Sequence, residues 1–107
     1  MTAGEQLLWS RIGAFALDDP RAGFQFTDRL ARDNGRSLHF AQRVAVAYKK
    51  FILLCAISPE PVTPSDVVDQ AWHLHMIYTE SYWTDLCRNT LGKQVHHNPT
   101  KGGPEGT

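Results

Sequence analysis

Residues 38–56 read LHFAQRVAVAYKKFILLCA, and this stretch decides the fold class. Its apolar positions recur at steps of four and three residues over about five turns, which is far longer than a β-strand allows. The positions that carry the apolar stripe are Ala41, Ala45, Tyr48, Ile52 and Cys55. The stretch therefore predicts a long helix with one buried face.

Helical spacing also marks two segments before this helix. Residues 5–17 and 24–34 carry apolar side chains three and four positions apart, so each segment predicts a helix. The first of them meets a proline at position 20, and the second is followed by Gly35, a residue that favours the left-handed backbone found past many helix ends. Both helices are expected to stop there.

A fourth helix is expected after the prolines at positions 59 and 61. Proline lacks the amide donor that a helix needs, so the chain turns before a new helix can begin. Thr63 is then predicted to cap a helix that starts at Pro64, with Asp66 near the positive end of the helix dipole.

An uninterrupted helix over residues 64–88 would be about 38 Å long, which exceeds the expected diameter of a domain of this size. The helix is therefore predicted to break near Tyr78 and Thr79. A fifth helix would begin with Thr79 as its cap and end at Gly92. Such a break turns the chain back on itself.

The whole chain of 107 residues predicts a single all-α domain. Its hydrophobic content of 42% and charged content of 21% are typical of soluble globular proteins. We expect a compact bundle of about five helices, with a helical core over residues 1–97. Residues 98–107 have the composition of an irregular loop or tail.

Charge and hydropathy exclude several classes of partner. Eleven basic and eleven acidic side chains balance, so we do not expect binding to nucleic acid. The longest apolar run covers residues 51–57, far short of the roughly 20 residues that cross a bilayer, so no membrane association is expected. The first ten residues lack a secretory signal, and we expect a cytoplasmic protein with reduced cysteines.

Several motifs together resemble one family. They read V-D-x-x-W-H-x-H at residues 68–75, Y-W-x-x-x-C at residues 82–87 and H-H-x-P-T-K-G-G at residues 96–103. The chain resembles the bacterial relatives of the plant glycine-rich-domain-containing proteins. That resemblance implies a helical fold without implying an activity. It also implies that a helix found after the G-G pair in relatives is missing from this chain.

Asp69 and His73 lie four residues apart on the predicted fourth helix, so they share one face. Asp69 could orient His73 as the partner of a metal-ligating or general-base histidine. Alternatively, the two side chains simply satisfy each other at a half-buried helix contact. The spacing alone leaves both interpretations open.

Imidazole and thiol groups are concentrated near the predicted turn, and they are donors that zinc prefers. The candidate zinc ligands are His73, His75, Cys87, His96 and His97. His73 and His75 are about 200° apart on a regular helix, so they converge only if the helix unwinds near His75. The alternatives are that Cys87 packs in the core and that His96 and His97 are exposed loop residues.

The sequence indicates no particular reaction, and whether the protein is an enzyme stays open. The first hypothesis is a binding or interaction module for a protein partner, with a polar site at the turn between helices four and five. The site residues expected for it are Asp69, Trp72, His73, His75, Tyr82 and Lys101. The alternative is a zinc-dependent enzyme or a structural zinc domain that uses the candidate ligands above.

Overall fold

A computed structural model describes residues 1–97 of the chain. It contains five helices and, within that range, no β-strand. The helices are α1 (Ala3–Ala14), α2 (Phe26–Asp33), α3 (Leu38–Ile57), α4 (Asp66–Ile77) and η1 (Glu80–Leu91). The predicted all-α bundle is confirmed. The expected loop over residues 98–107, Lys101 included, lies outside the described residues.

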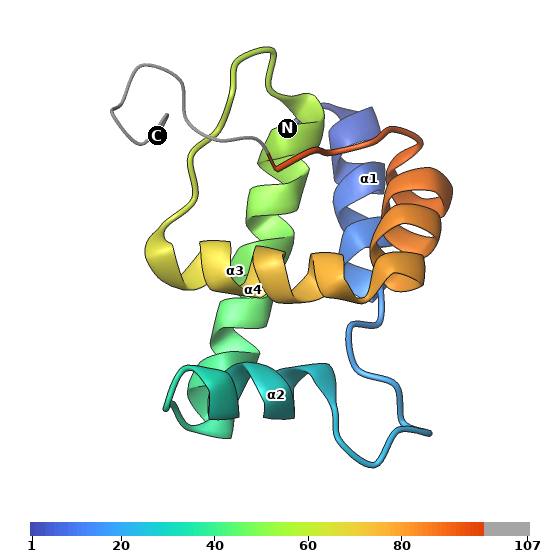
Figure 1. Ribbon diagram of the computed structural model, residues 1–107. Helices are drawn as coiled ribbons and strands as arrows, with labels where there is room; N and C mark the ends of the chain where they lie inside the picture. The colour runs from blue at the N-terminus through green and yellow to red at the C-terminus, as the bar shows by residue number, and fades with distance from the viewer. Residues whose placement is uncertain (98–107) are drawn as a thin grey trace.

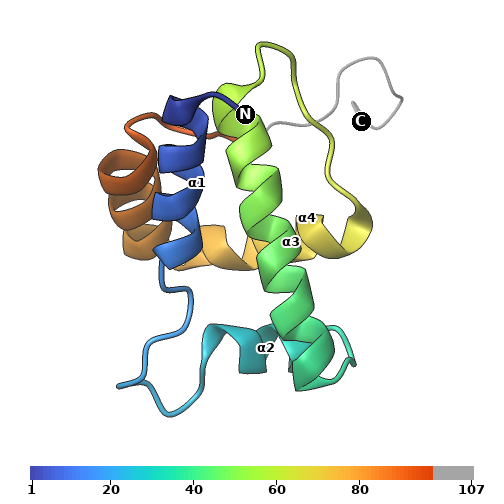
Figure 2. The same cartoon turned by 180° about the vertical axis from the view of Figure 1, so that it is seen from behind.

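Helix α3 forms the centre of the bundle. Helices α1, α2 and α4 all contact it, and α4 crosses it while η1 lies beside α1 (Figures 1 and 2). The predicted apolar stripe of α3 faces this contact region: Ala41, Tyr48 and Ile52 are each 1% exposed. Burying these side chains, rather than the intrinsic helix propensity of the stretch, supplies most of the stability of such a helix.

Helix α1 both begins and ends earlier than predicted, and α2 is shorter than predicted at both ends. Tertiary contacts use the residues between the two helices. Lys49 on α3 donates from Nζ to the carbonyl oxygens of Gly13 (3.1 Å) and Phe15 (2.6 Å), which satisfies acceptors at the end of α1. Asp18 accepts from the amide (2.9 Å) and the hydroxyl (2.8 Å) of Thr27 at the start of α2. The segment between the helices is thus held at both ends.

The predicted start of the fourth helix was two residues too early. Ser65, not Thr63, caps α4, and its hydroxyl accepts from the amide of Val68 (3.4 Å). Asp66 and Asp69 both lie in the first turn of α4, where the helix dipole favours a negative charge. Helix α4 therefore begins at Asp66.

The predicted break near Tyr78 is confirmed. Tyr78 leaves the helical conformation, with φ −82° and ψ 74°. The indole of Trp72 donates from Nε1 to the hydroxyl of Tyr82 over 2.9 Å. Ten residues of straight helix would separate these positions by about 15 Å, so the chain must turn between them.

The fifth helix, η1, is a π-helix whose backbone bonds are mostly of the i→i+5 type. Thr79 makes no side-chain bond to its first turn, so the predicted threonine cap was wrong. Gly92 ends the helix in the left-handed conformation, with φ 74°, as the sequence predicted. No helix in the described part of the chain has the length and apolar character needed to cross a membrane.

Candidate metal centre

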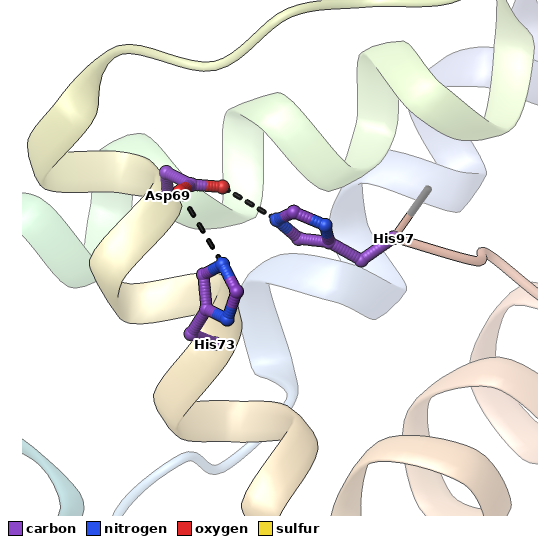
Figure 3. A group of neighbouring side chains, drawn as sticks. All are labelled: Asp69, His73 and His97. Atoms are coloured by element: carbon purple, nitrogen blue, oxygen red, sulfur yellow. Dashed lines mark hydrogen bonds and ion pairs between the residues drawn. The ribbon is translucent and has the colours of Figure 1, made fainter. Parts of the chain in front are cut away.

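Three side chains meet where α4 faces the segment that follows η1. The carboxylate of Asp69 accepts from Nε2 of His97 at 2.6 Å, and Nε2 of His73 lies 3.4 Å from the other carboxylate oxygen. Figure 3 shows both imidazoles turned toward this carboxylate. One oxygen or nitrogen donor from each residue lies within 4.8 Å of the other two. This group contains the donor types that bind a transition metal.

The helix places two of these donors, and the returning chain places the third. Asp69 and His73 stand one turn apart on the same face of α4, as their spacing predicted. His97 lies 28 positions after Asp69 in the sequence, beyond η1 and Gly92. The side chains are 35% exposed for Asp69, 61% for His73 and 21% for His97, so the group lies at the surface and opens to solvent.

Trp72 supports the position of His97. The two ring centroids are 4.2 Å apart, and the ring of Phe51 on α3 also packs against the indole, with centroids 4.8 Å apart. The bond from Trp72 to Tyr82 fixes the indole in turn. His97 therefore packs against a rigid aromatic side chain, and this limits the loss of side-chain entropy when it binds a ligand.

The structure does not bring His75 to this group. His75 is 1% exposed, and its ring nitrogens are bonded to the hydroxyls of Tyr48 (2.7 Å, Nδ1) and Ser81 (2.9 Å, Nε2). Helix α4 stays regular as far as Ile77, so the unwinding that convergence with His73 requires does not occur. Burial lowers the pKa of His75 to about 4, which keeps the ring neutral.

Cys87 lies in the core and is not close enough to join the three donors. It is fully buried, and the hydroxyl of Tyr82 and the backbone of Val95 lie near its thiol. Burial raises the pKa of this thiol, which disfavours the thiolate that would bind zinc. The alternative interpretation of Cys87 as a core residue agrees with this placement.

His96 points away from its neighbour His97. Its Nε2 lies 3.1 Å from Oε1 of Gln94, and its ring packs against Trp83 on η1 with centroids 5.3 Å apart. Adjacent residues of an extended segment direct their side chains to opposite sides, which explains the separation. Of the five zinc ligands that the sequence predicted, only His73 and His97 belong to the group that forms.

Two contributions were missed by sequence reasoning. Asp69 was expected to belong to the binding site and to orient His73 but not to bind a metal, yet each of its carboxylate oxygens faces one of the two imidazoles. Tyr48 was assigned to the apolar stripe of α3, yet its hydroxyl is the partner of buried His75. A tyrosine in an otherwise apolar stripe is the only local signal, because a buried hydroxyl needs a partner.

A family model described as UCP032817-like matches residues 23–102. The chain belongs to this family. The matched range includes α2, α3, α4 and η1 together with all three residues of the candidate metal centre, whereas α1 precedes it. No curated protein and no solved structure matches the chain significantly. The family description makes no link to the plant glycine-rich proteins, so that resemblance stays a prediction.

The donor set fits a divalent transition metal. Two imidazoles and one carboxylate are a combination that binds zinc at about 2.0–2.2 Å, with three protein ligands and room for a further donor. Ligands of a tetrahedral ion at such distances are about 3.3–3.6 Å apart. Shifts on the order of an ångström from the present positions are enough to reach that geometry. The direct bond from His97 to Asp69 would be replaced by bonds to the ion.

Proposed function

We propose that this domain is a metal-binding module and that its ligand is a divalent transition metal, zinc foremost. Asp69, His73 and His97 would bind the ion. The observation that carries the proposal is the convergence of three donors of the right type, within 4.8 Å, from two separate parts of the chain. The exposure of His73 gives the ion a route of entry from solvent.

The ligand set of this proposal differs from the one that the sequence predicted. It keeps His73 and His97, adds Asp69 and leaves out His75, Cys87 and His96. Three ligands leave at least one position of a tetrahedral ion for a donor that residues 1–97 do not supply. A protein partner that offers such a donor would unite the two hypotheses drawn from the sequence, a binding module and a zinc domain.

A cytoplasmic location remains part of this proposal. Cys55 and Cys87 are both free, as is usual for proteins of a reducing compartment. Free cysteines and a zinc site are compatible there, because thiols in that compartment are kept reduced.

Titration calorimetry of untagged, chelator-treated protein with zinc tests the proposal. We expect one ion per chain at pH 7.5. We also expect weaker binding at pH 5.5, because a metal competes with protons for the imidazoles. Asp69→Ala, His73→Ala and His97→Ala should each weaken binding by at least about tenfold.

The chain offers matched controls for this experiment. His96→Ala removes an imidazole next to His97, and Cys87→Ala removes the thiol of the sequence-predicted set; both variants should bind zinc like the parent protein. Binding that survives His97→Ala, or that is lost with Cys87→Ala in a folded protein, would show that the ligands are wrongly assigned. Absence of any zinc uptake would overturn the proposal.

A further inference from the structure

Residues 92–97, here called the return segment, run from the end of η1 back across the bundle (Figure 1). The amide of Lys93 donates to the carbonyl of Cys87 (3.0 Å), and its Nζ donates to the carbonyl of Ala56 (3.2 Å). Val95 is 7% exposed, and its carbonyl accepts from the hydroxyl of Tyr82. His97, the last residue of the segment, donates from Nε2 to the carboxylate of Asp69.

The return segment lies against two buried side chains, Cys87 and Trp72. Cys87 is fully buried, and the backbone of Val95 contacts its thiol. Trp72 is 6% exposed, and His97 lies on its ring. Release of this segment would therefore remove a neighbour from both the thiol and the indole.

Few apolar contacts hold the segment in place. Val95 is its one residue with a buried side chain. Ordering a short segment costs conformational entropy at every residue, so one buried side chain and a few hydrogen bonds give a weakly held cover. An ion that needs His97 beside Asp69 and His73 would bind the docked segment and not the released one.

We infer that the metal at Asp69, His73 and His97 controls the docking of the return segment, and thereby controls access to the thiol of Cys87 and the indole of Trp72. The inference rests on the proposed metal site and names what that site regulates. A ligand that binds one state alone favours that state by a factor of one plus its concentration divided by its Kd. Zinc at about 100 times its Kd should therefore make release of the segment about 100-fold rarer.

The rate of Cys87 alkylation by N-ethylmaleimide measures release of the segment. The experiment uses Cys55→Ser protein, in which Cys87 is the one remaining thiol, and follows labelling by intact mass, with and without zinc. We expect zinc at 100 times its Kd to slow labelling by up to about 100-fold, since alkylation requires the open state. Hydrogen exchange of the residue 92–97 amides should slow in parallel.

Three further variants in the same background separate the contributions. His73→Ala removes a metal ligand and the ring contact between His73 and His97 (centroids 4.3 Å apart) but leaves the bond between Asp69 and His97, so zinc should have no effect on its labelling rate. His97→Ala should be labelled faster than the parent even without metal, and zinc should not slow it. His96→Ala should respond like the parent. Circular dichroism checks that each variant keeps its helices.

The two proposals fail in different ways. Calorimetric zinc binding that needs all three ligands, combined with unchanged labelling and unchanged hydrogen exchange, would overturn control of the segment and leave the metal site standing. Slowed labelling that persists in His73→Ala would also overturn it, because the effect would then not arise from this site. Absence of zinc binding would remove both.

Discussion

At the scale of single residues, the two histidines of the sequence H-L-H in α4 have opposite environments. His73 faces solvent, whereas His75 is enclosed by the rings of Phe15, Phe26, Tyr48 and Tyr82, with centroids 5.2–5.9 Å away. Both ring nitrogens of His75 have a hydroxyl group as their partner. A hydroxyl can donate to one nitrogen of a neutral imidazole and accept from the other. His75 therefore acts as a buried polar link between α3, α4 and η1.

The burial of His75 predicts a loss of stability in mild acid. Its folded pKa of about 4 lies below the ordinary value of 6.5, so the unfolded chain binds a proton in this interval that the folded chain does not. The free energy of unfolding should therefore keep its His75 contribution above about pH 6.5 and lose it as the pH drops toward 4. The loss should be on the order of 3 kcal/mol. Urea denaturation from pH 7.5 to 4.5 measures this.

His75→Gln should flatten that dependence, even though it lowers stability overall. His39→Gln, at an exposed position of α3, should leave it unchanged. Nuclear magnetic resonance of the wild-type protein gives an independent check, because the His75 ring should remain neutral at pH 5.5. A His75 ring that protonates near pH 6.5 in the folded protein would contradict the prediction.

At the scale of elements, a helix boundary could be predicted from the sequence only where a single residue was able to form the cap. Two hydroxyl residues precede α4, Thr63 and Ser65, and sequence alone favoured the first. Ser65 has the extended backbone of a cap residue, with φ −67° and ψ 164°, and its hydroxyl reaches the amide of Val68. By contrast, the position past the end of η1 needs a left-handed residue, and Gly92 was the evident candidate.

The capping contact predicts unequal effects of two similar substitutions. Ser65→Ala should lower the free energy of unfolding by about 1 kcal/mol, because the amide of Val68 loses its acceptor. Thr63→Ala lies outside the helix and should change it by less than about 0.5 kcal/mol. Urea denaturation of both variants at pH 7.5 measures the difference. Equal effects, or a larger effect at Thr63, would support the sequence-based boundary instead.

At the scale of the molecule, α1 belongs to the same core as the other helices, although it precedes the residues that the family model matches. Ile12 on α1 is fully buried in that core. The residue before Ile12, Arg11, donates from its guanidinium to the carbonyl of Asn89 on η1 at 2.7 Å. Helix α1 therefore supports both α3 and the π-helix that leads into the return segment.

The position of α1 in the core predicts a large effect of truncating Ile12. Ile12→Ala should lower the free energy of unfolding by about 2–5 kcal/mol, because it leaves a cavity in the core. Leu7→Ala on the same helix is the control, since Leu7 is 65% exposed and should change the value by about 0.5 kcal/mol or less. Urea denaturation of the two variants measures both changes. If both free energies of unfolding fell by a similar small amount, α1 would not be part of the cooperative core.

The sequence by itself determined the fold class and most of the helices. The apolar spacing in α3 and the glycine after η1 express periodicity and backbone preferences that act over a few residues. The chain length also predicted the break near Tyr78, because a straight helix over residues 64–88 does not fit a domain of this size. These forces are local or depend only on chain length, so they can be read without coordinates.

Only the tertiary structure decided which donors meet. His75 and Cys87 had the right chemistry for zinc, yet the helix phase and the packing of η1 directed both into the core. Asp69 and His97 are 28 residues apart, and no local pattern links them. Their contact depends on the turn at Tyr78, the end of η1 and the course of the return segment together. Side-chain positions that depend on several successive turns are set by packing, which acts between residues distant in the sequence.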